Sequence, residues 1–380
     1  MRVGCVRSAA VSLLVVLAAF PAPGQAPGSA RVPDRSRATP RLFNDVLGHS
    51  VEWARPPERI VSLSPNVTEI LFAIECGEHV VGVTRFCNHP PETSGLPLPD
   101  EVPPFRRHDP AVPAIPLVLD SPHSGEHYPD DFDHLPPRAE VRRAEDTHVA
   151  RLYRGAPARG ATLIEALFPR AYLDVNRSLA DIDPALLSDA WPDALAPSRK
   201  TEQGIGLVWR LARGGGPMYG RPLTAAEVRR RIDRYYVPYH AALASALDER
   251  HRQFGAVWHI NCHSMPAVGD ANADDPGRER ADFVLGDRDG TTCDRAFTAF
   301  VAETLAGCGY DVAINDPYKG VELVRRHGRP ADNRHSLQIE VNRALYMDEA
   351  TLAPNAGYAK LEGDLARLID AVAAFVRARI

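Results

Sequence analysis

Two histidines stand in turns that follow short apolar segments, where an imidazole could bind a metal ion or transfer protons. His123 lies in the turn DSPHSG, directly after the apolar run IPLVL at residues 115–119. His263 lies in WHINCHSM, where a second apolar run meets a turn. Histidine is the commonest metal ligand and titrates near neutral pH. Because many turn histidines are purely structural, each position alone leaves both interpretations open.

The neighbours of His263 narrow its chemistry. Side chains alternate between the two faces of a strand, so Cys262 and His263 point in opposite directions while the strand lasts. This alternation disfavours a nucleophilic Cys–His pair. His259 stands earlier in the same run and is typical of a histidine inside a sheet.

Two acidic positions could supply a further ligand. Glu126 forms His-x-x-Glu with His123, a spacing that can converge on one ion. Glu145 and Asp146 lie in AEDTH, at the start of a predicted helix that runs to Tyr153. Acids in a first helical turn commonly interact with the helix dipole instead. The residues by themselves leave these alternatives open.

Glu340 lies within or at the end of an otherwise apolar strand, residues 337–341. A buried carboxylate without a partner is unfavourable, and its pKa tends to rise. We therefore expect Glu340 to be a general base or, equally, half of a salt bridge with Arg343.

Arg177 stands in a polar turn after an apolar run at residues 171–175. A guanidinium in such a turn is suited to hold a carboxylate through two parallel hydrogen bonds. The alternative is an internal ion pair with Asp181 or Asp183.

Two turn histidines, an acid, a buried glutamate and an Asn-Arg pair together indicate a mononuclear metallohydrolase. Zinc takes three protein ligands and keeps one position for water. The metal lowers the pKa of that water and polarises a carbonyl group. A glutamate then takes the proton of the water and delivers it to the leaving amine. An arginine fixes the substrate carboxylate, so that the scissile bond is positioned over the metal.

The elements that must position these residues follow an alternating pattern of strands and helices, which predicts an α/β domain. In open α/β sheets, ligands bind beyond the carboxyl ends of the strands. The longest predicted helix spans residues 224–252, with Thr224 as its cap and Glu227 completing a capping box. Strands are predicted at residues 115–119, 171–175, 257–261, 283–285, 312–314 and 337–341, and further helices at 293–305 and 358–378.

The composition excludes several classes of protein. The chain has 380 residues, a net charge of −5 and 44% hydrophobic residues, which suffices for two domains with a core and excludes global disorder. A nearly neutral chain is also a poor candidate for nucleic-acid binding. We therefore expect a small-molecule partner and no nucleic acid. The sequence leaves the oligomeric state open.

Residues 1–30 have the layout of a secretory signal peptide. Arg2 and Arg7 precede an apolar run at residues 9–20 and the small-residue stretch PAPGQAPGSA. Twelve apolar residues are too few to span a bilayer, and no later segment is long and apolar enough. We therefore expect export to the periplasm or medium. The remaining cysteines form no Cys-x-x-Cys pair, although one disulfide, such as Cys76 to Cys87, is compatible with that compartment.

A separate segment at residues 41–92 reads as a βα unit. Its text RIVSLSPNVTEILFAIECGEHVVGVTRFCNHPPE resembles the start of periplasmic binding proteins for cobalamin and iron-siderophores. The resemblance stops there, so the chain carries a truncated piece, either a genuine fusion or a gene-model artefact. Pro-rich text at residues 93–114 predicts a linker. An alternative function is therefore a binding-protein fragment fused to an inactive hydrolase domain.

Residues 102–380 resemble the N-formylglutamate amidohydrolase (deformylase) family. The matching pieces run in order: PLVLDSPHSG, AEDTHVARLY, FPRAYLDVNRSLADIDP, PYHAAL, NCHSMPA, DFVLGDRDGTTCD, NDPYKG and RHSLQIEVNRALYMDE. The resemblance implies a phosphorylase/hydrolase-like three-layer α/β sandwich with a mixed sheet, as in zinc carboxypeptidases and aspartoacylase. It places the catalytic domain at residues 115–380.

The resemblance also implies a site, a cofactor and a reaction. The metal ligands would be His123, Asp146 and His263; the base Glu340; the groups for a substrate carboxylate Asn176 and Arg177; and those for a second carboxylate Arg325 and Arg326. The likeness to zinc carboxypeptidases favours Glu126, in His-x-x-Glu with His123, as the acidic ligand, whereas the likeness to the deformylase family favours Asp146.

The implied cofactor is one divalent metal ion, zinc, and the implied reaction is hydrolysis of N-formyl-L-glutamate, or a related N-acyl amino acid, to formate and L-glutamate. That step belongs to histidine catabolism, for which a cytoplasmic location is expected. This location conflicts with the predicted signal peptide, unless the N-terminal segment is an artefact.

Overall fold

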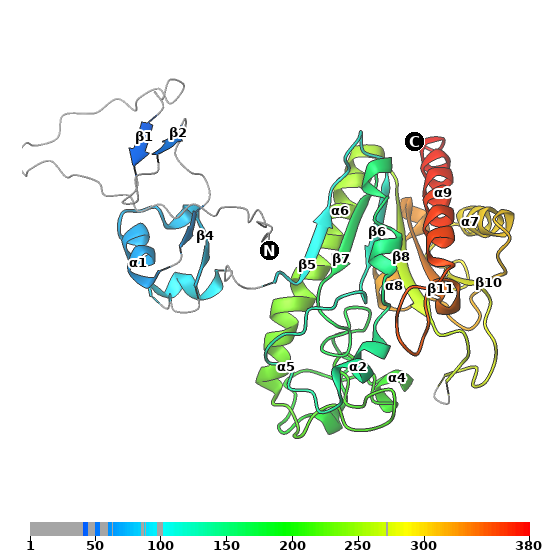
Figure 1. Ribbon diagram of the computed structural model, residues 1–380, viewed down its shortest axis with the longest axis horizontal. Coiled ribbons are helices and arrows are strands. Elements are labelled where there is room, and N and C mark those ends of the chain that lie inside the picture. The colour runs from blue at the N-terminus through cyan, green and yellow to red at the C-terminus, as the bar shows by residue number, and fades with distance from the viewer. Residues whose placement is uncertain are drawn as a thin grey trace, which may run out of the picture. The chain divides into compact units, whose positions relative to one another are not determined.

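The computed structural model describes residues 41–44, 50–53, 60–62, 64–84, 87, 89–96, 102–270 and 273–380. The chain divides into two compact units, Met1–Glu101 and Val102–Ile380 (Figure 1). The predicted signal peptide, residues 1–30, lies outside the described residues. Among the helices that the structure describes, none has the length and apolar character needed to cross a membrane.

Unit 1 contains the predicted βα unit. Strands β3 (Ile60–Ser62) and β4 (Val80–Val83) pair in parallel, and helix α1 (Pro65–Ala73) lies between them in the chain. The helix begins at Pro65, because proline is well suited to the first helical position. Strands β1 (Arg41–Asn44) and β2 (Ser50–Trp53) form an antiparallel pair. Cys76 and Cys87 are free thiols, so the disulfide considered from the sequence is absent.

Unit 2 is built on a seven-stranded mixed sheet. Its central strands β11, β8, β6 and β7 are parallel, whereas β9 pairs antiparallel with β11, and β5 pairs antiparallel with β7. The strand order is β10 (Val312–Ile314), β9 (Phe283–Gly286), β11 (Arg334–Asn342), β8 (Val257–Met265), β6 (Leu117–Ser121), β7 (Thr162–Ala166), β5 (Phe105–His108).

Two sequence predictions about this sheet were wrong. Residues 171–175 form a turn rather than a strand, and the sheet contains instead β7 at Thr162–Ala166, which was not predicted. The turn bonds instead to a neighbouring loop, where the Asp174 amide donates to the carbonyl of Leu207. The predicted linker at residues 93–114 contains β5, which pairs with β7, so the sheet of unit 2 begins before residue 115.

Helices cover both faces of the sheet and give three layers (Figure 1). One face packs against α3 (Val149–Leu152), α7 (Arg295–Gly307) and α9 (Tyr358–Arg377). The other face packs against α5 (Ala225–Arg231), α6 (Val237–Phe254) and α8 (Glu322–His327). Shorter helices are α2 (Arg138–Val141), α4 (Arg199–Glu202) and 3₁₀ turns at Gly77–His79, Pro91–Gly95, Arg142–Ala144, Pro157–Arg159, Pro184–Leu186, Pro330–Asp332 and Arg343–Leu345.

The long helix predicted from Thr224 is confirmed, with one irregularity. Thr224 and Glu227 form the expected capping box. A π-helical turn, Ile232–Tyr236, joins α5 to α6 just before Pro238. Proline has no N–H for the helical ladder, so a widened turn at this position is physically reasonable.

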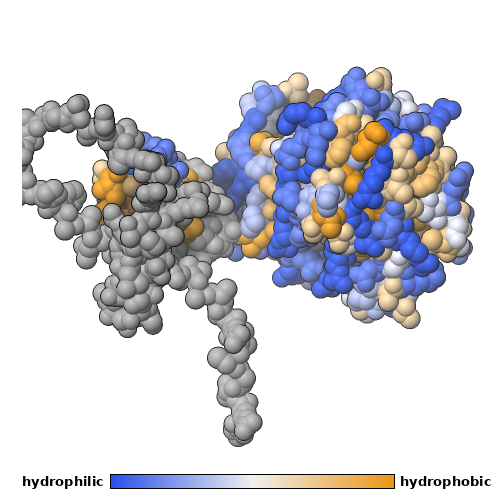
Figure 2. Space-filling view, turned by 90° about the horizontal axis from the view of Figure 1, so that it is seen from above, coloured by the Kyte–Doolittle hydropathy of each residue, from blue (hydrophilic) through white to orange (hydrophobic). Residues whose placement is uncertain are grey.

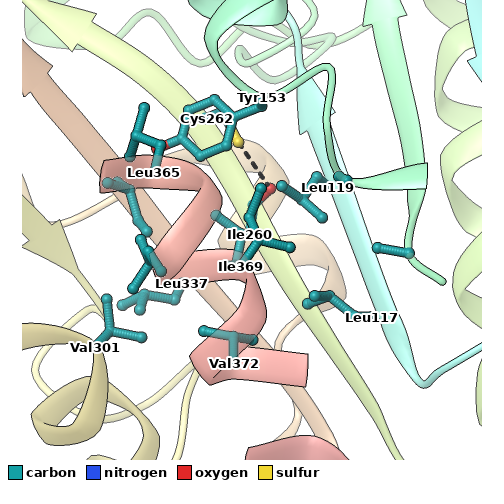
Figure 3. Packing of buried hydrophobic residues seen from close by; sticks show 14 of the residues in the cluster. Leu117, Leu119, Tyr153, Ile260, Cys262, Val301, Leu337, Leu365, Ile369 and Val372 are labelled. Carbon is teal, nitrogen blue, oxygen red and sulfur yellow. Dashed lines mark hydrogen bonds between the residues drawn. The ribbon is translucent and has the colours of Figure 1, made fainter. Parts of the chain in front are cut away.

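The layer under α9 is a close-packed apolar core. Figure 3 shows Ile260 and Cys262 of β8 packed with Leu337 of β11 and with Leu365 and Ile369 of α9. On the outside, the face of unit 2 that Figure 2 shows carries hydrophobic residues in small groups among hydrophilic ones. That face therefore offers no broad apolar surface.

Candidate active site

The face of the sheet opposite α9 carries a stripe of buried polar side chains across its three central strands. Along β11, Leu337, Ile339 and Val341 enter the core under α9, so the residues between them must point to the other face. The same alternation sends the polar residues of β8 and β6 to that face. The stripe consists of Asp120, His259, Asn261, His263, Ser336, Gln338 and Glu340, all buried.

His123, Asp146 and His263 converge at the edge of this stripe. Their ligand atoms lie within 4.8 Å of one another, and all three side chains are buried. The Nδ1 atoms of His123 and His263 lie 3.3 and 3.0 Å from the same oxygen, Oδ2 of Asp146. Two nitrogens and one carboxylate oxygen form a donor set that fits a divalent metal ion such as zinc.

Local structure explains how these residues meet. The Asp146 amide donates to the carbonyl of His123, which ties the two turns together. A Cβ atom at Gly125 would lie 2.3 Å from the carbonyl oxygen of Phe168, so this turn requires glycine. The predicted helix around Asp146 begins only at Val149, so Asp146 precedes it and is not a dipole partner in its first turn. His263 lies within β8 rather than at its end.

Each of the three side chains is oriented by a hydrogen bond to its atom on the far side of the cluster. His123 Nε2 lies 2.7 Å from Oδ1 of Asp174, and His263 Nε2 lies 2.7 Å from Oδ1 of Asn261. Arg343 holds the other oxygen of Asp146 at 3.1 Å. Burial alone would raise the pKa of Asp146, but its bonds to the two histidines hold that pKa well below its ordinary value.

Replacing Asp174 with asparagine should weaken zinc binding by about 10–100-fold, because the partner that orients a histidine ligand also raises its basicity. The measurement is zinc affinity by competition with a chelator of known affinity. Asp183→Asn is a matched control in the same segment, since it removes a carboxylate paired with Arg210. Equal zinc affinities for wild type and Asp174→Asn would contradict the orienting role.

Glu126 does not join the cluster. Its side chain is half exposed and forms an ion pair with Arg142 at 2.9 Å. Of the two acids considered from the sequence, Asp146 therefore converges with the two histidines and Glu126 does not.

Glu340 lies beside the cluster, opposite His263 in the register of β11 and β8. Burial raises the pKa of Glu340, and the nearby charge of Asp146 adds to this effect against the opposing influence of His263. The predicted alternative, a salt bridge with Arg343, is wrong, because that guanidinium binds Asp146 instead. Gln338 donates to Oε1 of Glu340 at 3.0 Å.

Arg177 is buried, and the structure gives it no ion pair among the described residues. Its Nε donates weakly to the carbonyl of Ile205, at 3.4 Å. The alternative pairing with Asp181 or Asp183 is wrong, since Asp181 binds Ser198 and Thr201, and Asp183 binds Arg210. A buried guanidinium without a carboxylate is suited to receive one from a ligand.

Asn176 contacts the cluster directly. Its Nδ2 lies 3.3 Å from Nε2 of His263, and its Oδ1 accepts from the amide of Leu323 at the start of α8. Its predicted role toward a substrate carboxylate stays a prediction.

Arg325 and Arg326 are not brought together with the other predicted residues. Both are exposed on α8, and Arg325 pairs with Glu322 at 2.6 Å. Their role as ligands of a second substrate carboxylate was predicted from their charge alone. On the short helix α8, both side chains are exposed to solvent instead.

Sequence reasoning did not predict the roles of Arg170 and Arg213, or the contact of Arg343 with Asp146. Arg170 binds Asp174 at 2.8 Å, and Arg343 binds Asp146. Arg213 pairs with Asp270, and burial together with the nearby charge of Arg343 lowers the pKa of Arg213 to about 10. The Arg170–Asp174 spacing of four residues was a readable signal, but the other pairs join distant segments.

Comparisons with known proteins agree with this geometry. The sequence profile of the N-formylglutamate amidohydrolase family matches residues 115–347. An N-formylglutamate deformylase from Pseudomonas aeruginosa is 28% identical over 260 residues, which cover 66% of this chain and 87% of that protein. One from Pseudomonas putida is 29% identical over 247 residues, which cover 62% of this chain and 83% of that protein.

A solved structure extends the likeness to three dimensions. The crystal structure of N-formylglutamate amidohydrolase from Ralstonia eutropha JMP134 is 49% identical, with a TM-score of 0.70, and the match covers 73% of this chain and all of that one. The family profile matches more than half of the chain, and the matched part carries the converging histidines and acids. The chain therefore belongs to the N-formylglutamate amidohydrolase family and is an amide hydrolase.

Proposed function

We propose that the protein hydrolyses the amide bond of N-formyl-L-glutamate, or of a related N-acyl amino acid, to release formate or the corresponding acid and the free amino acid. The observation that carries the proposal is the buried cluster of His123, Asp146 and His263 with Glu340 beside it. The names of the curated relatives support the choice of substrate.

The three converging side chains would hold one divalent metal ion, and their donor set suits zinc. When bound, such an ion would polarise the amide carbonyl and make the attacking water more acidic. Asp174, Asn261 and Arg343 keep the three side chains in place for it.

Glu340 would act as the general base. Gln338 holds Oε1, so Oε2 is the atom that would take the proton of the attacking water and then pass it to the leaving nitrogen. Burial suits this task, because a raised pKa brings a carboxylate closer to the pH at which it must both accept and release a proton.

Arg177 would bind the substrate carboxylate, and its removal is a sharp test. We expect Arg177→Met to lower kcat/KM for N-formyl-L-glutamate by about 10²–10³-fold, since a buried charge pair is lost. For the analogue in which a neutral carboxamide replaces the α-carboxylate of the substrate, kcat/KM should fall far less. The measurement is formate release from both compounds.

Arg325→Met is the matched control for this experiment, because it removes an exposed arginine of α8. It should leave kcat/KM near the wild-type value. If Arg177→Met affected the acid and the amide equally, the carboxylate would not bind at Arg177. A large loss in Arg325→Met would restore the role that the sequence suggested for α8.

Two features of the protein favour different cellular locations. The signal-like residues 1–30 favour export, whereas a step of histidine catabolism favours the cytoplasm. The alternative function, a binding-protein fragment fused to an inactive hydrolase, has no support, because the residues predicted for catalysis converge in unit 2.

A further inference from the structure

A chain of buried hydrogen bonds runs from His263 into the sheet, away from Asp146. Nε2 of His263 bonds to Oδ1 of Asn261 at 2.7 Å, and Nδ2 of Asn261 donates to Oδ1 of Asp120, also at 2.7 Å. His259 contacts the same oxygen of Asp120 at 2.9 Å. All four residues are buried, and none exposes more than 2% of its surface.

The register of the sheet builds this chain. Asp120 of β6 and Asn261 of β8 are direct partners across parallel strands, so their side chains lie next to each other on one face. Asn261 and His263 are two residues apart on β8 and share that face. Tyr239 of α6 closes the far end, where its hydroxyl donates to Oδ2 of Asp120 at 2.6 Å.

The direction of each bond follows from Asp120. An ionised carboxylate can only accept hydrogen bonds, and every partner of Asp120 can donate one. Asn261 must therefore turn its NH₂ group to Asp120 and its oxygen to His263. An oxygen at 2.7 Å requires a proton on Nε2 of His263. Of the two ring nitrogens, only Nδ1, which faces Oδ2 of Asp146 at 3.0 Å, can then offer a lone pair to a metal ion.

A second amide favours the opposite arrangement. Nδ2 of Asn176 lies 3.3 Å from the same Nε2, and its own oxygen is held by the amide of Leu323. It can therefore only donate to His263, which would require an unprotonated Nε2. The contact of Nε2 with Asn261 is shorter than its contact with Asn176, so Nε2 keeps its proton as long as Asp120 fixes the orientation of the Asn261 amide.

We propose that Asp120 and Asn261 are positioning residues that set the tautomer of His263, so that its Nδ1 is available to the metal ion. Without the carboxylate of Asp120, the Asn261 amide can rotate, Asn176 can donate to Nε2, and the proton moves to Nδ1, where it blocks the metal. The inference rests on the proposed metal site, and neither Asp120 nor Asn261 itself binds the metal ion.

The test is zinc affinity of the full chain, measured by competition with a chelator of known affinity. Asp120→Asn should lower the affinity by about 10–100-fold, the size typical of losing a group that orients a ligand. Asp364→Asn is the matched control, because Asp364 is also buried and accepts from Tyr310 at the same 2.6 Å. It should leave zinc affinity unchanged.

The double variant Asp120→Asn/Asn261→Asp distinguishes a role in setting the direction of the hydrogen bonds from a purely structural role in packing. It exchanges the amide and the carboxylate, so position 120 now donates to position 261, and position 261 still accepts from Nε2 of His263. Zinc affinity should recover toward wild type, whereas a purely structural role predicts that the two losses add. Near-UV circular dichroism and thermal unfolding show whether each variant is folded.

A measurement on the unaltered protein needs no variant to fold. With ¹⁵N-labelled histidine and bound zinc, Nε2 of His263 should keep its proton and Nδ1 should show the metal-induced shift. A metal-bound Nε2, unchanged affinity in Asp120→Asn, or no recovery in a folded double variant would overturn the inference alone. A wild-type protein that binds no zinc would overturn both the inference and the proposed metal site.

Discussion

Replacing Glu340 with glutamine is expected to lower kcat for N-formyl-L-glutamate by about 10²–10⁴-fold, the range that general acid–base catalysis contributes. Glutamine keeps the shape and the neighbour Gln338 but cannot accept a proton. Zinc affinity and thermal stability should change little, since Glu340 forms no ion pair among the described residues. The measurement is formate release under saturating substrate, with zinc content determined in parallel.

Glu303→Gln provides the control for this substitution. Glu303 is exposed on α7, so the same chemical change there should leave kcat unaltered. If Glu340→Gln retained wild-type turnover in a folded, zinc-loaded sample, another group would have to move the proton.

Replacing His263 with alanine is expected to abolish stoichiometric zinc binding and to lower activity by about 10³-fold or more, because the metal supplies several kcal/mol of transition-state stabilisation. The side chain is buried between Asp146 and Asn261, and no neighbouring histidine of the described chain joins the cluster except His123. Metal content after dialysis and formate release are measured on the same sample.

His251→Ala is the matched histidine control. His251 lies near the end of α6, and its Nε2 bonds to the carbonyl of Asp332 at 2.9 Å. It should bind zinc and turn over substrate as the wild type does. Full zinc binding by His263→Ala would show that the metal is held elsewhere.

Local signals in the sequence predicted much of the fold. The apolar run at residues 337–341 predicted the strand that holds Glu340, and the capping box at Thr224 marked the start of the long helix. Both signals depend on neighbours within a few residues. The strand at residues 171–175 was wrong, because that segment and Thr162–Ala166 are both short and apolar, and only pairing with β6 and β5 distinguishes them.

The candidate site was predictable where its residues lie in a strand or directly after one, and not where distant segments meet. The sequence could not decide between Glu126 and Asp146, because the choice depends on the turn at Gly125, which packs against the Phe168 carbonyl. Arg343 and Asp146 are almost two hundred residues apart in the chain, so no local sequence spacing could predict their ion pair. The outward direction of Arg325 likewise depends on its contact with Glu322.

The most direct test of the account is formate release from N-formyl-L-glutamate by the purified chain, assayed as isolated, after chelation, and after zinc is added back. The account predicts activity that is lost on chelation and restored by the metal. A folded sample that binds zinc and releases no formate in any state would contradict the proposed reaction.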